Sequence, residues 1–169
     1  MKTLKEYLFC SPGLLSKVEE VREIDDCIER VKWDREFKLP HNGKLLEHQP
    51  AYNKAFEIEF GAHNWESQPL LYNDPPLIGD FRKNDVFVKT QFVSSATLYK
   101  DYFKFHYGLT HKLLSLAILI VPTNPKHFFP VKKTENSVRN MAEFNLAYMY
   151  FKLLPIPVPI LLIGLLPNN

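Results

Sequence analysis

The sequence predicts a single α/β domain with a mixed central β-sheet flanked by helices. Segments with helical spacing of apolar residues alternate along the chain with short apolar runs that are typical of buried strands. The length of 169 residues suits one domain. Apolar residues make up 46% of the chain and charged residues 24%, which excludes a largely disordered protein and a small disulfide scaffold.

Helical periodicity and start signals predict four helices. Ser16 and Glu19 have the spacing of a capping box before the first. Pro50 suits the first turn of the second helix. Residues 34–49 are polar and contain turn-forming residues, so we expect a loop there. The expected helices span residues 16–33, 50–63, 94–107 and 137–153.

Apolar runs bounded by turn residues predict four strands. The run 114–121 is continuously apolar and ends at Pro122, as a fully buried strand does. A polar turn at 82–84 separates the first two strands, and a basic loop containing prolines follows at 122–136. The expected strands span residues 77–81, 85–92, 114–121 and 160–165.

Composition also bears on partners and location. The net charge of +2 is too small to predict nucleic-acid binding by itself. The two cysteines, Cys10 and Cys27, fit no metal-site spacing and favour a reducing compartment. The apolar segment 153–167 is too short to cross a membrane and contains prolines that would break a helix. We therefore expect a cytoplasmic protein without a membrane segment.

The strand expected at 85–92 carries two long polar side chains, Lys89 and Gln91, on one face. A hairpin with its turn at 82–84 would bring Asp80 beside them. This convergence resembles the Pro-Asp…(Asp/Glu)-x-Lys nucleases, in which carboxylates on two neighbouring strands hold Mg²⁺ and a lysine assists the attacking water. Taken alone, the same spacing also describes a surface hairpin with solvated charges, which is the more common case.

Longer stretches resemble the BglII/BstYI-like type II restriction endonucleases. The segments AYNKAFEIEFGAHNWE, IGDFRKNDVFVKTQF, LYKDYFKF, LAILIVPTN and PIPVPILLIGLLP carry the similarity. It implies a nuclease core over 50–167, preceded by a helix and loop over 1–49. Members of the family are homodimers, and they cleave palindromic double-stranded DNA sites with a GATC core in a Mg²⁺-dependent reaction. A symmetric dimer matches the symmetry of such a site.

The resemblance implies a metal-binding role for Asp80 and a role for Gln91 in positioning water or the phosphate. In the family pattern a glutamate stands nine residues after the aspartate, within Val-Glu-Val-Gln-Phe, but here Lys89 occupies that position. At ~4 Å and an effective dielectric constant of about 20, one unit charge is worth about 4 kcal/mol against another. We therefore expect weak Mg²⁺ binding and a severely impaired nuclease. Alternatively, Lys89 turns outward and another acid completes the site.

Glu59 is the acid expected to replace the missing glutamate. Glu59 lies on the apolar stripe of the helix 50–63, and this stripe should face the sheet. Glu57 lies off the stripe, so we expect it to be exposed to solvent. Glu59 is equally compatible with a partly exposed acid that caps a neighbouring donor. The expected catalytic residues are Asp80, Lys89, Gln91 and Glu59, with Asp80 and Glu59 as the ligands of Mg²⁺.

Basic residues in two segments are candidate contacts to DNA phosphates, whose neutralisation supplies much of DNA affinity. One pair lies one turn apart on the third helix, and the others lie in or beside the basic loop. A solvated helix face and an ordinary surface loop explain them equally well. A catalytically inactive DNA-binding protein on the same scaffold and an unrelated α/β protein remain alternatives. The candidate residues are Lys100, Lys104, Lys126, Lys132, Lys133 and Arg139.

Overall fold

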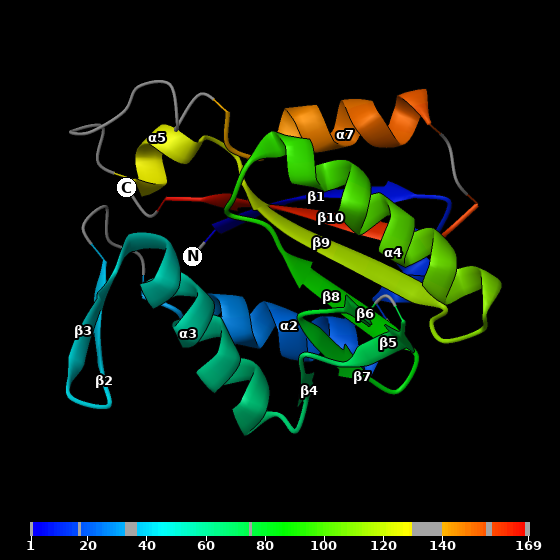
Figure 1. Cartoon of the computed structure of the whole chain (residues 1–169). Coiled ribbons are helices and arrows are strands. Elements are labelled where there is room, and N and C mark those ends of the chain that lie inside the picture. The colour runs from blue at the N-terminus through cyan, green and yellow to red at the C-terminus, as the bar shows by residue number, and fades with distance from the viewer. Residues whose placement is uncertain are drawn as a thin grey trace.

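The computed structural model describes residues 2–16, 18–32, 37–74, 76–129, 140–154 and 157–167. A six-stranded mixed sheet lies at the centre, between two layers of helices (Figure 1). Helices α2 (Glu19–Arg30) and α3 (His48–Ala62) cover one face of the sheet. Helices α4 (Leu98–Thr110) and α7 (Phe144–Leu153) cover the other. The predicted class, a mixed α/β sheet flanked by helices, is confirmed.

The strands of the central sheet follow the order β1-β10-β9-β8-β7-β4. Strands β10, β9 and β8 are parallel neighbours, and the remaining pairs are antiparallel. Strand β9 is buried along its whole length, because it lies between two parallel strands and beneath helices on both faces. The six strands are β1 (Lys2–Leu8), β4 (Glu66–Ser67), β7 (Phe81–Lys83), β8 (Val86–Thr90), β9 (Leu116–Pro122) and β10 (Ile160–Leu166).

Alternation along the strands divides the core into two clusters. Val88 and Ile118 face α2 and α3, whereas Phe87 and Leu119 face α4 and α7. A slip of one residue in the register of β8 would exchange these faces, so burial on both sides specifies the register. The register of β8 is what sets the surroundings of each polar side chain near its end.

Helix α2 begins later than expected. The predicted capping box is wrong, because the N-cap is Val18 and the Oγ atom of Ser16 donates to the carbonyl oxygen of Gly13 at 3.1 Å. Ser16 instead ends a short helix, α1 (Pro12–Leu15). The other expected helices correspond to α3, α4 and α7. A 3-10 turn, Ser95–Thr97, precedes α4. The helix expected at 137–153 begins only at Phe144, because residues 140–143 are not helical and Met141 forms an isolated bridge with Ser94, while residues 137–139 lie outside the described part of the chain.

Two segments expected to lack strands contain them. Lys2–Leu8 forms the edge strand β1, which pairs with β10. The expected loop at 34–49 contains the hairpin of β2 (Lys38–His41) and β3 (Lys44–Glu47). Asn42 and Gly43 form its turn with φ values of 49° and 73°. This Asn-Gly pair is the standard signal for a two-residue hairpin turn, and the polar composition of the segment masked it.

The strand expected at 77–81 is divided between two sheets. Strand β6 (Pro76–Ile78) pairs with β5 (Leu70–Asn73) in a separate two-stranded sheet, and β7 begins at Phe81. Lys83 pairs with Val86, so the turn lies at 84–85 and the prediction of 82–84 is wrong. Phe81 pairs with Val88, and this register carries Asp80 to the end of β8.

The expected buried strand near the C-terminus is confirmed as β10, which lies between β1 and β9. All but its last residue are buried. Within the ranges that the structure describes, no helix is both long enough and apolar enough to cross a membrane.

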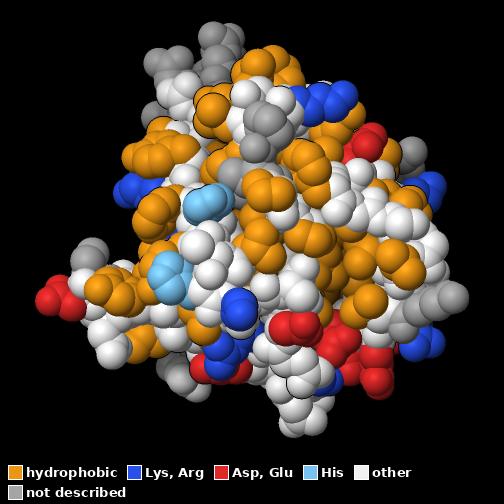
Figure 2. Space-filling model, turned by 90° about the vertical axis from the view of Figure 1, so that its right-hand side faces the viewer, with side chains coloured by type: hydrophobic (Ala, Val, Ile, Leu, Met, Phe, Trp, Pro, Cys, Tyr) orange, Lys and Arg blue, Asp and Glu red, His pale blue; other side chains and the backbone are white. Residues whose placement is uncertain are grey.

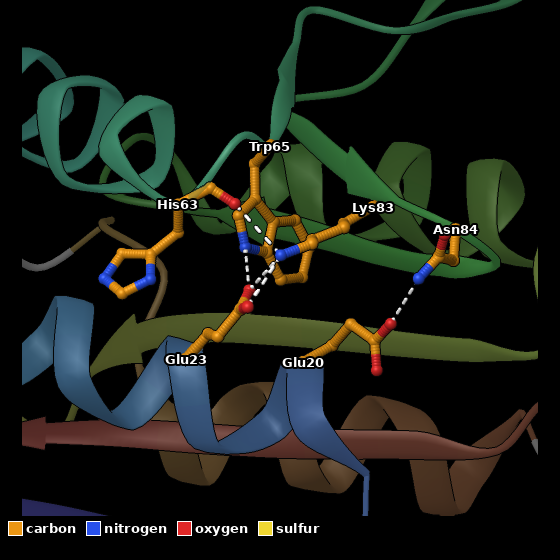
Figure 3. A network of polar contacts seen from close by, with 6 residues as sticks. All are labelled: Glu20, Glu23, His63, Trp65, Lys83 and Asn84. Atoms are coloured by element: carbon orange, nitrogen blue, oxygen red, sulfur yellow. Dashed lines mark hydrogen bonds and ion pairs between the residues drawn. The ribbon is translucent and has the colours of Figure 1, made fainter.

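A polar network joins α2 to the hairpin of β7 and β8 (Figure 3). The Lys83 ammonium donates to both carboxylate oxygens of Glu23, at 2.6 and 2.8 Å, and to the carbonyl oxygen of His63 at 3.0 Å. Trp65 Nε1 donates to Glu23 at 2.9 Å. Burial raises the pKa of Glu23, but the hydrogen bonds from Lys83 and Trp65 outweigh it and lower the pKa overall. The ionised carboxylate therefore helps to fix α2 against the sheet.

Figure 2 looks onto the end of the molecule where β8 and β9 begin. Apolar side chains gather across the middle of this face, and acidic side chains gather along its lower edge. A cavity of ≈ 440 Å³ lies beside the starts of these strands, between them and the segment around α1. The polar site described next lies at the opposite end of β8.

Candidate functional site

A cavity of ≈ 180 Å³ lies at the carboxyl end of β8. One wall is formed by residues 49–57 of α3, and the others by β8 with the residues that follow it, the end of β4 and the segment that leads into β7. Asp80 and Lys89 both line it, as the sequence predicts. Further polar lining comes from Gln49, Asn53, Glu57, Ser67, Gln68 and Thr90.

Asp80 accepts three hydrogen bonds. Its Oδ1 atom lies 2.6 Å from the Nζ atom of Lys89. Its Oδ2 atom accepts from both the backbone N–H and the hydroxyl of Thr90, each at 2.9 Å. Both carboxylate oxygens therefore already have donors, and the positive charge of Lys89 directly neutralises Asp80.

The backbone around Asp80 is held by close packing. The carbonyl oxygen of Asp80 accepts from Gln68 N at 2.8 Å, and Gly79 N donates to the carbonyl oxygen of Pro69 at 2.9 Å. A Cβ atom on Gly79 would lie 2.1 Å from the ring of Phe87, so a side chain here would displace a fully buried aromatic group. Glycine is required because β8 approaches this turn closely.

Gln91 does not join Asp80 and Lys89 in the cavity. Its Nε2 atom donates to Asp101 Oδ2 at 2.6 Å, and its Oε1 atom accepts from Val93 N at 3.1 Å. The side chain is only 3% exposed, and Gln91 is not among the described residues that line the cavity. The expected convergence of three side chains is therefore wrong for Gln91: alternation places it on the same face as Lys89, but its amide group bonds Asp101 of α4 instead of entering the cavity.

Asp101 is a buried polar residue that sequence analysis did not assign to the site. It is 2% exposed. Burial raises the pKa of its carboxyl group, and the nearby charge of Lys89 and the hydrogen bond from Gln91 offset this only in part. A signal was present in the sequence, because Leu98, Asp101, Phe105 and Gly108 form the buried stripe of α4 at helical spacing.

Glu59 is not among the described residues that line the cavity. Glu57 lines the cavity instead, and its Oε1 atom lies 2.8 Å from the Nζ atom of Lys54. Glu59 lies toward α2, where burial first and the charge of Glu59 second raise the pKa of Cys27 to about 12. The cavity meets α3 along Gln49, Asn53 and Glu57, a stripe of four-residue spacing beside the apolar one.

The basic residues expected to contact DNA fall into three groups. Lys104 is partly buried, and burial together with the charge of Lys89 lowers its pKa, which places a second cation near the cavity. Lys100 and Lys126 are exposed, the latter on the short helix α5 (Pro125–Phe128). Lys132, Lys133 and Arg139 lie outside the described residues.

The donor set of the cavity does not fit Mg²⁺. Mg²⁺ requires oxygen ligands in near-octahedral geometry, including one or two carboxylates. Here both oxygens of Asp80 are hydrogen-bonded, and the Lys89 ammonium stands 2.6 Å from one of them. Glu57 is paired with Lys54. Across the described ranges, no three His, Cys, Asp or Glu side chains are grouped so that they could hold a metal ion.

Comparisons with known proteins identify the family. The family model described as restriction endonuclease BglII/BglIII matches residues 10–165. A crystal structure of restriction endonuclease BglII complexed with a DNA 16-mer is similar, with a TM-score of 0.70 and 19% sequence identity, over 99% of this chain and 78% of that chain. No curated protein sequence matches. This chain belongs to the BglII/BglIII restriction endonuclease family and has the restriction endonuclease fold.

Proposed function

We propose that this protein is a type II restriction endonuclease whose catalytic site is impaired by Lys89. It binds a short palindromic site in double-stranded DNA, with GATC as the first core sequence to test. Hydrolysis of the phosphodiester bond depends on Mg²⁺ and is slow or absent in the present sequence. The observation that carries the proposal is the 2.6 Å ion pair between Lys89 and Asp80 inside the cavity. Family membership and the DNA complex of the similar structure support DNA as the substrate.

The impairment follows from charge. A hydrolytic site of this kind uses a hard cation to stabilise the charge that develops on the phosphate. An ammonium group at position 89 repels that cation and takes up the carboxylate oxygen that would bind it. At ~4 Å and an effective dielectric constant of about 20, two unit charges interact with an energy of about 4 kcal/mol. The repulsion between the Lys89 ammonium and a divalent ion at this distance is twice as large.

A second candidate function is a DNA-binding protein without catalysis on the same scaffold. The hydrogen bonds of Asp80 favour it, because Lys89 and Thr90 occupy both carboxylate oxygens. The two functions share the DNA complex and differ only in cleavage. A single substitution at position 89 distinguishes them.

The palindromic site calls for a homodimer, in which a two-fold axis of the protein matches that of the DNA. Helices α4 and α7 offer a surface for the second copy. Tyr99 and Phe103 on α4 are 61% and 58% exposed, and Met149 and Leu153 on α7 are 56% and 71% exposed. These helices pack side by side, and a mainly apolar cavity of ≈ 180 Å³ lies between them. Exposed apolar side chains at such density are typical of subunit interfaces.

The test is cleavage of unmethylated plasmid DNA in Mg²⁺ by the natural protein, Lys89→Glu and Lys89→Gln. We expect Lys89→Glu to cut at a fixed site, because the second carboxylate is restored. Lys89→Gln removes the positive charge and supplies a neutral amide oxygen in place of a second carboxylate, so it should remain inactive.

Three results would contradict this account. Cleavage by the natural protein at a rate equal to that of Lys89→Glu would refute the impairment. Cleavage by Lys89→Gln would show that charge alone, rather than the missing ligand, limits the reaction. The absence of both cleavage and DNA binding in all three proteins would refute the proposed function.

A further inference from the structure

The Lys89 ammonium lies within the cavity rather than on an open surface. The side chain of Lys89 is 16% exposed. It projects from β8, a strand that pairs with β9 along one edge and with β7 along the other. In the register of the sheet Lys89 lies opposite Leu119, a fully buried residue of the central strand. The positive charge is therefore a fixed part of the cavity wall.

This charge balances the acids of the cavity. Asp80 and Glu57 are the carboxylates among the described residues that line it. Lys89 lies 2.6 Å from Asp80, and Lys54 lies 2.8 Å from Glu57. Each acid thus has a cation of the chain itself as its partner, and no further cation is required to neutralise the cavity.

The rest of the lining suits an anion. Gln49, Asn53 and Gln68 contribute amide groups, and Ser67 contributes a hydroxyl group. A lysine ammonium has three hydrogens to donate, so Lys89 retains donors beyond the one it directs to Asp80. Lys104 lies near enough for the charge of Lys89 to lower its pKa, in addition to the larger effect of burial. The cavity therefore has balanced charges, neutral polar groups and an ammonium group with hydrogens left to donate.

We propose that Lys89 acts as a built-in counter-ion that admits a phosphodiester group of double-stranded DNA to this cavity without a divalent cation. With a carboxylate at position 89, two acids would face the entering phosphate and repel it until a cation bound. With lysine there, the charge of Asp80 is already balanced, so the phosphate enters a neutral cavity and can accept a hydrogen bond from the ammonium group. The inference rests on the proposed DNA-binding function and adds that binding does not depend on divalent cations.

The experiment measures binding of a fluorescently labelled palindromic duplex with a central GATC by anisotropy, in EDTA and in Ca²⁺. Ca²⁺ is a hard cation that also takes oxygen ligands. We expect the natural protein to bind equally well in both. Lys89→Glu should bind about tenfold or more weakly in EDTA and regain affinity in Ca²⁺. Lys89→Gln should weaken binding in EDTA and lower the salt-dependence slope by about one.

Lys112→Glu is the matched control. It makes the same charge change on an exposed lysine that follows α4, at the end of the molecule remote from the cavity. We expect it to leave the ratio of affinities in EDTA and Ca²⁺ unchanged. Circular dichroism melting of each variant separates a loss of binding from a loss of folding.

The outcomes separate the inference from the proposed function. Cation-independent binding by the natural protein, with Ca²⁺-dependent binding by Lys89→Glu, supports the counter-ion role. Binding by the natural protein only in Ca²⁺ overturns that role and leaves DNA binding intact. Folded protein that binds no duplex in either condition, for every variant, overturns the proposed function and the inference together.

Discussion

The Gln91 amide nitrogen donates a 2.6 Å hydrogen bond to Oδ2 of Asp101, and both side chains are buried. The bond connects the end of β8 to the first turn of α4. The other end of the amide accepts from Val93 N, so Gln91 also orders the chain between the strand and the helix. In this protein Gln91 therefore joins the sheet to a helix, beside the cavity rather than within it.

Asp101→Ala should destabilise the protein by about 1–3 kcal/mol, because the buried Gln91 amide loses its acceptor. Urea unfolding at neutral pH measures the change. Asp101→Asn keeps an acceptor oxygen and should lose less. Equal losses in the two variants would mean that the hydrogen bond contributes little.

The stability of the protein should depend on the protonation of Asp101. Burial raises the pKa of this carboxyl group above its ordinary value of 3.8. The folded state then holds the proton more tightly than the unfolded state, so this contribution is fully present below pH 3.8 and is lost as pH rises through the folded pKa. Urea titrations from acid to neutral pH measure the unfolding free energies of the natural protein and of Asp101→Asn. As pH rises, we expect the natural protein to lose stability relative to Asp101→Asn. A difference that is flat with pH would contradict this.

Glu23→Gln should destabilise the protein by about 1–3 kcal/mol at neutral pH, because Lys83 and Trp65 donate to a carboxylate at this position. The pKa of Glu23 is lowered from 4.5, so the contribution is present above pH 4.5 and is lost as pH falls through the folded pKa. Chemical denaturation across this range measures it.

Glu20→Gln is the control for Glu23→Gln. Glu20 lies on the same helix and accepts from Asn84 at 2.5 Å in an exposed position, where Gln can also accept (Figure 3). We expect a change of about 0–1 kcal/mol. A larger effect than that of Glu23→Gln would show that the contacts of Glu23 with Lys83 and Trp65 are not the main ones that fix α2.

Gly79→Ala should destabilise the protein by about 1–3 kcal/mol, since its Cβ would overlap the buried ring of Phe87. The shift would also move the adjacent Asp80. Gly61→Ala serves as the comparison, because a Cβ there meets no atom within 4 Å and alanine favours the helix by up to about 1 kcal/mol. Thermal melting of both variants should give shifts of opposite sign. A stabilising Gly79→Ala would refute the close approach of β8.

The double variant Phe103→Glu with Leu153→Glu should be monomeric at concentrations where the natural protein is dimeric. Both side chains are exposed and apolar on α4 and α7, and burying the new charges in an interface is costly. Sedimentation equilibrium measures the association constant, and circular dichroism shows whether the fold is kept. An unchanged dimer would place the interface elsewhere on the molecule.

Local patterns in the sequence determined much of this protein. Period-two alternation and uninterrupted apolar runs determined β8, β9 and β10, because a strand between two helical layers must be apolar on both faces. The spacing of Asp80 and Lys89 around a tight hairpin determined their contact, even though the turn lies at 84–85 rather than 82–84. These features depend on neighbours along the chain or across one turn.

The tertiary structure alone decided which polar side chains share a cavity. Gln91 donates to Asp101, and Glu57 rather than Glu59 lines the cavity. Both outcomes depend on how α3 and α4 pack on the sheet, because this packing determines which side chains of each helix face β8 and the cavity. Strand β1 likewise exists because β10 offers a free edge 150 or more residues away. The periodic spacing of apolar residues in helices and strands shows which residues are buried. The partner of a buried polar group depends on how separate elements pack together, and this cannot be read from the spacing within one element.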